Sequence, residues 1–540
     1  MQETFNLTKN LSKVRRNGKL ATHSNWSVLG PVLLVGLGLG LRLFLLDAKS
    51  LRLDESYNYG TATGVSSWDL LTGRVYRSGH PPFFYLAWHQ WIKYLGNAEF
   101  VLRLPMALAG TLQIPAIYLA GCKLFNSQVG LLAALGVTIS PFLVSYSQEA
   151  GVYSFFATAA ACMLGLFWQA LISPKLTHWL LFSIAALITL YIHLFTLFLF
   201  VVEPLIILPL LLQPNLYPQE QTSKLNPKQS LVRGWLLSMC IRGLALLLVM
   251  PTLTNAAHQP AANPLPFVGL PQIFYRLLKT YTYRLPVLID NHTLPELLPS
   301  LIALLLLIVG ASPALHFGRN WFAAKSSPLI SPVGSNAGLA TYALVGWLTI
   351  PPLLVFGLSF IVHAFNEPYL ICGTNFFWLL LANGLVLVGQ KMGKVGPLVA
   401  LTCGLALVVA AIWWLGYVYF DPRLDREPWR EAGVFLADEA TPGDVLVLEP
   451  DYDFKVVSYY YLGYLPLPTF LMGTPYSQAK AQELLAQVLH DRPPHIWLIF
   501  RHDDLDIVAN GFLRQQLDQT TSQTKSWQQN LLEIREYSPK

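Results

Sequence analysis

The sequence predicts an α-helical polytopic membrane protein with a small α/β domain at its C-terminal end. Of its 540 residues, 54% are hydrophobic and only 12% are charged, and its mean hydropathy is +0.45. Many apolar runs exceed the roughly 18 residues that indicate a transmembrane helix. Up to residue 419, 25 basic residues outnumber 12 acidic ones, whereas from residue 420 onward acidic residues lead by 18 to 11. The chain therefore divides into a membrane part, 27–419, and a soluble part, 420–540.

The N-terminal segment, residues 1–26, sets the orientation of the membrane part. It holds five Lys or Arg residues and one acidic residue, Glu3. The positive-inside rule places this segment in the cytoplasm, so the chain emerges outside after Leu46. The first apolar run is too long for the core of a cleavable signal peptide and lacks a small-residue cleavage site, so we expect it to remain as a helix.

The apolar runs predict about eleven membrane-spanning helices. They are expected at 26–46, 103–122, 128–147, 152–172, 178–196, 197–213, 235–252, 297–315, 340–361, 369–389 and 397–419. The loops that this arrangement places inside carry nine Lys or Arg residues and a single acidic residue, Glu220, in agreement with the positive-inside rule. A shorter apolar segment, 81–95, is interpreted as a helix lying at the external surface. In the alternative arrangement this segment crosses, 178–213 forms one helix, and residues 123–175 change sides.

The external parts of the chain are long enough to carry a function. Two external loops, 47–102 and 253–296, exceed what a connection requires, and their aromatic content argues against disorder. The soluble part, which this topology also places outside, shows two buried strands and two segments of helical periodicity. The strands are expected at 444–448 and 495–500, and the helices at 429–440 and 478–489.

The composition argues against several classes of function. The net charge of +6 resides in short loops, where it reports topology and contact with anionic lipid rather than binding of nucleic acid. Five cysteines lie in or beside apolar runs, and no His, Cys or Asp spacing is typical of a metal site. A metal cofactor is therefore unsupported, although a divalent cation stays an option. Glycine-rich phosphate loops and a nucleophile elbow are missing, which favours a lipid-borne donor over a soluble nucleotide.

Asp54 and Glu55 form the first adjacent acid pair of the chain, and the topology places them just outside the lipid. A carboxylate in this position can take a proton from an acceptor hydroxyl or orient it. Adjacent residues of a helix seldom point the same way, so we expect one of the two to act while the other supports it. The alternative interpretation is a solvated turn in which Asp54 caps a helix.

Other polar residues gather at the external ends of the predicted helices. They are His80, Glu149, His193, Arg276, Lys279, Arg284 and His292. Glu149 separates two apolar runs and is either functional or a structural ion-pair partner of Arg52 or Arg103. His80 is a positioned donor or a helix cap, and His193 is a ligand or a core histidine. The cations of the 253–296 loop fit a phosphate or an anionic lipid equally well.

Several short motifs occur in a characteristic order and spacing. They are Arg52–Glu55, Gly79–Pro82, Arg103–Pro105, Ser140–Pro141, Tyr146–Ala150, Tyr191–His193, Glu427–Arg430 and Gly443–Asp444. Through most of 27–213, and again near 426–444, the chain resembles bacterial membrane glycosyltransferases of the protein mannosyltransferase and aminoarabinose transferase kind, family 39 in the C-type superfamily.

This resemblance implies the C-type glycosyltransferase fold and a location in the bacterial inner membrane. It implies an enzyme that moves a sugar from a polyprenyl phosphate to a hydroxyl on protein, lipid or glycan at the external face, with inversion. Asp54 is then the candidate base, with Glu55 beside it as the second catalytic residue. The implied donor-phosphate ligands are Arg52, His80, His193, Arg276, Arg284 and His292. The implied cavity residues are Tyr57, Arg103, Glu149 and Tyr153.

The sequence departs from the family pattern at two positions. Relatives tend to have an arginine where this chain has Gly151, and another near Cys372. Two missing cations near a leaving phosphate would weaken electrostatic stabilisation. Two other classes therefore stay open: a non-enzymatic assembly or sensor protein on the same fold, and a secondary transporter, which the gathering of acids at the external rim disfavours.

Overall fold

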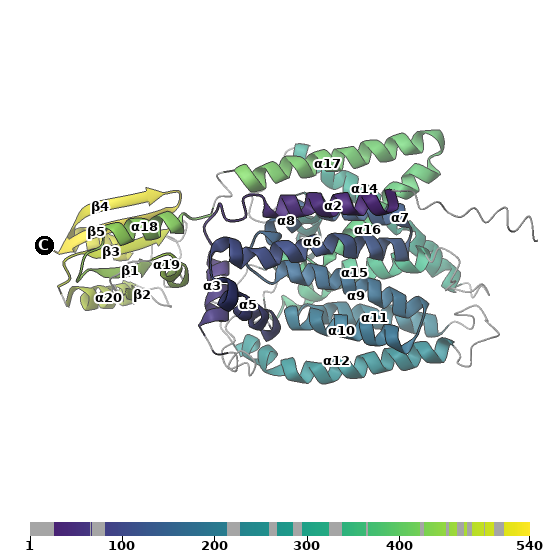
Figure 1. Ribbon diagram of the computed structural model, residues 1–540, viewed down its shortest axis with the longest axis horizontal. Helices are drawn as coiled ribbons and strands as arrows, with labels where there is room; N and C mark the ends of the chain where they lie inside the picture. Colours follow the sequence, from purple (N-terminus) through teal and green to yellow (C-terminus); the bar gives the residue numbers. More distant parts are fainter. Residues whose placement is uncertain are drawn as a thin grey trace, which may run out of the picture.

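The computed structural model describes residues 26–64, 66, 81–212, 227–258, 267–283, 294–322, 337–362, 365–421, 426–449, 453–461, 469–471, 478–490, 492–501 and 512–539. Long helices form a bundle, and a small five-stranded sheet with its covering helices lies at one end of it (Figure 1). The predicted fold class, a mostly helical membrane protein with a C-terminal α/β unit, is confirmed.

The bundle contains a helix at each of the predicted spans. These helices are α2 (Trp26–Leu43), α6 (Glu99–Leu124), α7 (Ser127–Ile139) with α8 (Pro141–Ser147), α9 (Tyr153–Ile172), α10 (Leu176–Ile192), α11 (Thr196–Leu211), α12 (Pro227–His258), α14 (Leu294–Phe322), α15 (Ala337–Leu358), α16 (Gly373–Lys391) and α17 (Gly396–Phe420). Among the described residues, six helices are long and apolar enough to cross a bilayer, or seven if α7 and α8 count as one span. The protein is a multi-pass membrane protein, whereas the number eleven stays a prediction.

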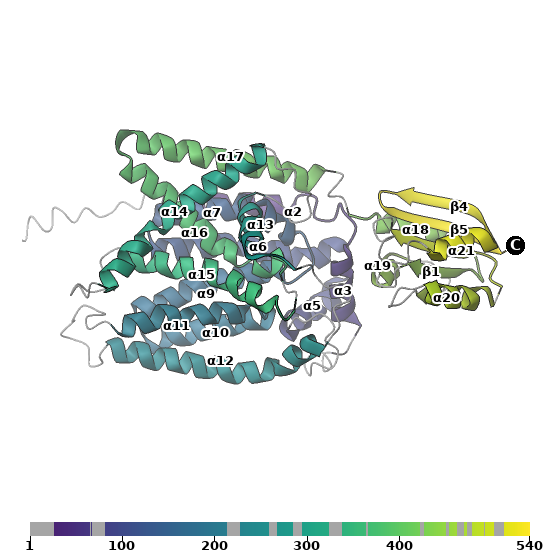
Figure 2. The same cartoon turned by 180° about the vertical axis from the view of Figure 1, so that it is seen from behind.

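Shorter helices lie where the long ones end. They are α3 (Leu53–Thr63), α5 (Pro82–Leu95), α13 (Leu270–Thr282) and the 3-10 turns η1 (Glu367–Leu370) and η2 (Gly393–Val395). Helices α3 and α5 contact each other at the end of the bundle that faces the sheet (Figures 1 and 2). Helix α5 is the segment that the sequence predicts as a surface helix.

The predicted span over 128–147 is not one straight helix, because the chain bends by 58° between α7 and α8. Pro141 has no N–H to donate to the carbonyl of Val137, and Ser140 before it takes an extended conformation with ψ 118°. The buried guanidinium of Arg42 replaces the lost donor, since its Nη2 donates to the Val137 carbonyl at 3.2 Å and its Nη1 to the Thr138 carbonyl at 3.4 Å. The break turns α8 toward the candidate active site.

Close helix packing in the bundle depends on small residues, as is usual in membranes. A Cβ atom at Gly121 of α6 would lie 2.6 Å from the Cα of Gly130 in α7. A Cβ atom at Gly310 of α14 would lie 2.0 Å from the carbonyl oxygen of Leu380 in α16. These two crossings bring backbones into direct contact and hold the helices that support the site.

The C-terminal unit is a mixed sheet of β1 (Val445–Glu449), β2 (Thr469–Leu471), β3 (Ile496–Arg501), β4 (Thr521–Gln529) and β5 (Leu532–Pro539), in the order β2-β1-β3-β5-β4. The first three strands are parallel, and β5 pairs antiparallel with β3 and β4. Helices α18 (Trp429–Glu439) and α19 (Phe454–Tyr460) cover one face, and α20 (Gln478–His490) and α21 (Phe512–Thr520) cover the other. The predicted strands and helices of this unit are all present, whereas β2, β4, β5, α19 and α21 were not predicted.

The C-terminal unit contacts the bundle through side chains that meet Glu99, at the start of α6. The Glu99 carboxylate pairs with Arg430 and accepts a hydrogen bond from the Tyr460 hydroxyl. The same hydroxyl accepts a hydrogen bond from the backbone N–H of Leu51 at 2.6 Å. The unit is therefore anchored to the loop that precedes α3.

Candidate active site

Breaks between helices gather the polar side chains at the end of the bundle beside the sheet (Figure 1). These breaks are the start of α3, the segment 148–152 between α8 and α9, His193 between α10 and α11, and η1 before α16. Each break exposes backbone groups that an unbroken helix would satisfy internally. The site is therefore built from segments that lie far apart in sequence.

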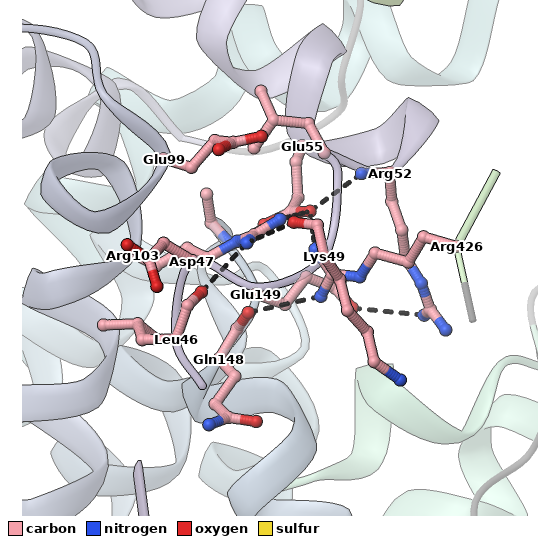
Figure 3. Close-up of polar contacts among 12 residues, drawn as sticks. Leu46, Asp47, Lys49, Arg52, Glu55, Glu99, Arg103, Gln148, Glu149 and Arg426 are labelled. Atoms are coloured by element: carbon pink, nitrogen blue, oxygen red, sulfur yellow. Dashed lines mark hydrogen bonds and ion pairs between the residues drawn. The ribbon is translucent and has the colours of Figure 1, made fainter. Parts of the chain in front are cut away.

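Glu55 is the centre of this end of the bundle and is completely buried (Figure 3). Its Oε1 accepts from Arg103 Nε at 2.8 Å and from the backbone N–H of Ala150 at 2.7 Å. Its Oε2 accepts from Arg103 Nη2 at 3.0 Å, from the backbone N–H of Arg52 at 2.8 Å, and from Arg426 Nη1. We call Glu55, Arg103 and Arg426 the Glu55 cluster, which joins the start of α3, α6, the 148–152 break and the start of the C-terminal unit.

The two arginines of the cluster also hold the neighbouring backbone. Arg103 donates to the carbonyls of Leu46, Lys49 and Ser50 at 2.8 to 3.0 Å. Arg426 donates to the carbonyls of Ser50 and Gln148 at 3.1 and 3.2 Å. The loop from Leu46 to Arg52 is therefore fixed by charged donors, and the position of α3 is fixed with it.

Burial alone would raise the pKa of Glu55, but the two guanidinium groups outweigh it and lower the pKa to about 2. Glu55 therefore stays ionised throughout the physiological range. A carboxylate with five donors and no exposed surface cannot approach a substrate. Its geometry suits a positioning role for the adjacent Asp54.

Asp54 occupies the first turn of α3 and is exposed. Partial loss of hydration raises its pKa above 3.8, the repulsion of Glu55 and Glu427 adds to the rise, and Arg52 opposes it. Among the described residues, the Asp54 carboxylate has no ion-pair partner within 4 Å. A solvent-accessible carboxylate with a raised pKa, held beside a rigid cluster, has the properties of a general base.

Glu149 forms the ion pair with Arg52 that the sequence allowed as its structural alternative. The Arg52 Nη1 lies 3.3 Å from Glu149 Oε2, and the two side chains are 32% and 7% exposed. Burial raises the pKa of Glu149 to about 7, since it outweighs the attraction of Arg52. This carboxyl therefore gains its proton closer to neutral pH than an ordinary glutamate, and in its neutral form it leaves the Arg52 charge available to another anion.

We expect the stability of the protein to depend on the protonation of Glu149. The folded state binds this proton more tightly than an ordinary glutamate of pKa 4.5, so the stabilisation is complete below that pH and is lost as pH rises to about 7. Wild-type protein should lose about 3 kcal/mol of folding stability across this pH range. The Glu149→Gln protein should not show this loss, because glutamine does not titrate. Melting temperatures in detergent across this range measure the effect, and parallel pH profiles for both proteins would contradict it.

Aromatic side chains from three breaks surround the same space. Tyr153 at the start of α9 stacks on Tyr369 of η1, with ring centroids 6.4 Å apart, and lies edge-on to Tyr146 of α8 at 5.1 Å. His193 stacks on Phe156 at 4.6 Å, and its Nδ1 accepts from the backbone N–H of Phe195. His193 also lies beside Tyr369, with ring centroids 5.8 Å apart, so the three breaks meet through these rings.

Arg276 of α13 reaches the same end of the bundle from another side. Its guanidinium pairs with the buried carboxylate of Glu367 in η1 and lies over the ring of Phe365 at 5.2 Å. The Arg276 side chain is 39% exposed, so one side of it stays open to solvent. Glu367 therefore neutralises part of the charge of Arg276. Arg276 is not a simple replacement for the arginines that the family pattern has at Gly151 and near Cys372.

The predicted site residues that the structure describes fall into two groups. Arg52, Asp54, Glu55, Arg103 and Glu149 come together around the Glu55 cluster, whereas Tyr153, His193 and Arg276 belong to the aromatic side of the site. Tyr57 is exposed on α3. The predicted residues His80, Arg284 and His292 lie outside the described residues.

Sequence reasoning missed the roles of Arg426, Glu367 and Tyr369. Arg426 begins a motif stretch that the family resemblance includes, and this was the available signal for it. A Cβ atom at Gly151, one of the departures from the family pattern, would lie 3.5 Å from Asn58 Nδ2, so the position has room for a side chain. In the described part of the chain, no group of three His, Cys, Asp or Glu residues is arranged to hold a metal ion.

The helical bundle with its polar end has the fold of the C-type membrane glycosyltransferases, as comparison with known proteins shows. The model of the family described as dolichyl-phosphate-mannose-protein mannosyltransferase matches residues 79–217. A comparison with curated proteins gives no match. The resemblance to this superfamily that the motifs predict is confirmed.

Solved structures share the fold at low sequence identity. ArnT from Cupriavidus metallidurans in the apo state has a TM-score of 0.54 and 14% identity, over 94% of this chain and 97% of that chain. The same protein bound to undecaprenyl phosphate has a TM-score of 0.51 and 13% identity, with the same coverage. The oligosaccharyltransferase from Archaeoglobus fulgidus in the apo form has a TM-score of 0.52 and 11% identity, over 94% of this chain and 74% of that chain.

Proposed function

We propose that this protein is a glycosyltransferase that moves a sugar from a polyprenyl-phosphate donor to an acceptor hydroxyl at the external face of the bacterial inner membrane. The observation that carries the proposal is the placement of Asp54. Its carboxylate is accessible and raised in pKa, and it lies at the end of a membrane bundle next to the rigid Glu55 cluster. The resemblance and the fold support the choice of reaction.

In the proposed reaction, Asp54 accepts the proton of the acceptor hydroxyl as its oxygen attacks the anomeric carbon. The bond between that carbon and the phosphate oxygen breaks, and the phosphate leaves with its polyprenyl tail still in the lipid. Attack opposite to the phosphate inverts the anomeric centre. Arg52 is the proposed phosphate ligand, because its pairing with Glu149 weakens when that carboxyl is protonated.

The donor class rests on two arguments. The sequence has no motif for a soluble nucleotide, and the site lies at the end of apolar helices where a lipid headgroup would meet it. ArnT has been solved with undecaprenyl phosphate, and the Archaeoglobus fulgidus oligosaccharyltransferase with dolichol-phosphate and with an acceptor peptide. The acceptor is a protein, lipid or glycan hydroxyl. The proposal requires no metal, and a divalent cation would be an addition to it.

We also propose that the chain consists of three segments with different locations. Residues 1–26 form a cytoplasmic segment, 27–419 form the membrane glycosyltransferase domain with external loops 47–102 and 253–296, and 420–540 form an extracytoplasmic domain. The contacts of Arg426 and Arg430 support a role of this last domain in holding the loop before α3.

The test is a transfer assay with purified full-length protein and a panel of radiolabelled polyprenyl-phosphate sugars, offered with extracts of cell-envelope lipid, glycan and protein. We expect label to pass to an acceptor with at least one donor. Failure of every donor would favour the second candidate, a non-enzymatic membrane assembly protein on the same fold. The absence of arginines at Gly151 and Cys372 is the observation that favours that candidate.

A further inference from the structure

A cavity of about 610 Å³ lies between α7, α16 and α17, away from the candidate active site. Helix α17 runs along the edge of the bundle (Figure 1). Most of the residues that line the cavity are aliphatic, among them Leu131, Leu385 and Val408. Leu401 and Leu405, which also line it, are 58% and 53% exposed, so the cavity opens to the bundle surface. We call it the α17 groove. In a membrane such a groove is filled by hydrocarbon rather than water.

Two glycines define the shape of the α17 groove. A Cβ atom at Gly404 of α17 would meet no other atom within 4 Å, so this position borders open space. A Cβ atom at Gly136 of α7 would lie 2.2 Å from the Trp378 ring, so that wall is closed by packing. The open side is therefore the face of α17, where a hydrocarbon chain can lie without displacing a side chain.

One end of the α17 groove is basic. Gln128, Gln390 and Pro397 line this end, where α7 begins, α16 ends and α17 begins. The turn between α16 and α17 carries Lys391 and Lys394, which are both exposed. Residues 121–130 and 388–398 contain no Asp or Glu, and no ion pair of these two lysines occurs in the described part of the chain. The N-terminal ends of α7 and α17 add partial positive charge.

The basic end lies opposite to the candidate active site. Helix α7 begins there and continues through α8 to Glu149, and α17 begins there and ends six residues before Arg426. A polyprenyl-phosphate donor would bring its phosphate to the Asp54 end of the bundle. Its phosphate would therefore lie far from the positive charge at the basic end of the α17 groove. The positive-inside rule assigns the mouth to the cytoplasmic leaflet.

We propose that the α17 groove binds one acyl chain of an anionic phospholipid of the cytoplasmic leaflet, with the lipid phosphate beside Lys391 and Lys394. The aliphatic wall supplies the binding energy, and the two lysines supply the headgroup selectivity. The site is independent of glycosyl transfer. It would tie α17 to α7 and α16 through a lipid.

The experiment uses full-length protein in detergent, incubated with phosphatidylglycerol or phosphatidylcholine and examined by native mass spectrometry. We expect wild-type protein to retain one phospholipid and to prefer phosphatidylglycerol. Gly404→Leu puts a side chain into the groove and should lower retention by roughly tenfold. Gly416→Leu is the matched control, because a Cβ atom there also meets open space, but the residue lies on α17 outside the groove lining.

The lysines are tested separately with Lys391→Gln combined with Lys394→Gln. This variant should still retain a phospholipid but lose the preference for phosphatidylglycerol. Equal retention by the Gly404→Leu and Gly416→Leu proteins would overturn the groove assignment. A preference for phosphatidylglycerol that survives loss of both lysines, or a wild-type preference for undecaprenyl phosphate added as a competitor, would overturn the headgroup assignment.

Discussion

Asp54→Asn is expected to lower the rate of sugar transfer by about 10² to 10⁴, the range that a general base contributes. The amide keeps the size of the side chain but cannot take the acceptor proton. The fold should survive, because the Asp54 residue is exposed and has no ion-pair partner among the described residues. Transfer rates with the best donor of the panel, together with melting temperatures, measure the change.

Asp47→Asn is the control for this substitution. Asp47 lies in the loop that precedes α3, is exposed, and loses the same charge in this variant. Among the described residues, its backbone carbonyl accepts a hydrogen bond from Arg430, and its carboxylate has no ion-pair partner. Its variant should transfer sugar at the wild-type rate. Equal rates for the Asp54→Asn and wild-type proteins would show that another group takes the proton.

Glu55→Gln is expected to destabilise the protein by about 3 to 5 kcal/mol, the cost of breaking a buried ion pair. The substitution leaves Arg103 and Arg426, whose side chains are 1% and 9% exposed, without the negative charge that they share. It also loosens the loop that carries Asp54, so activity should fall with stability. Thermal unfolding in detergent measures the first effect and the transfer assay the second.

Glu439→Gln provides the comparison for an exposed pair. Glu439 pairs with Lys525, and these side chains are 38% and 49% exposed, so Glu439→Gln should destabilise the protein far less than Glu55→Gln. The contribution of Glu55 to stability also depends on pH. Because the pKa of Glu55 is lowered to about 2 from 4.5, its contribution is complete above pH 4.5 and is lost only as pH falls toward 2. A Glu55→Gln protein as stable as wild type near neutral pH would contradict the buried-cluster role.

The membrane helices were predictable because each contains one long apolar run bounded by charged or polar turns. The same reasoning missed the bend before Pro141, although the Ser140–Pro141 pair carries the physical signal for it, a missing N–H after a residue held extended. The sequence does not predict that Arg42 replaces the hydrogen-bond donor lost at Pro141, because Arg42 contacts carbonyls almost a hundred residues later in the chain.

The acid pair Asp54 and Glu55 shows which part of the site the sequence does not determine. The residue pattern predicts that one of Asp54 and Glu55 acts while the other supports it, and only the family resemblance favours Asp54 as the base. The structure separates them by burial: Glu55 is enclosed by two arginines and Asp54 is exposed. One of those arginines is Arg426, 371 residues away, and no local pattern predicts a contact at that separation.

The central claim is that Asp54 lies in a water-accessible position on the external side of the membrane. It is tested most directly by placing a single cysteine at position 54, in a chain whose five native cysteines are replaced by serine, and labelling intact spheroplasts with a membrane-impermeant thiol reagent. We predict labelling from the outside, with a cysteine at Lys391 labelled only after the membrane is opened. Labelling of position 54 only from the cytoplasmic side would contradict the proposed reaction at its starting point.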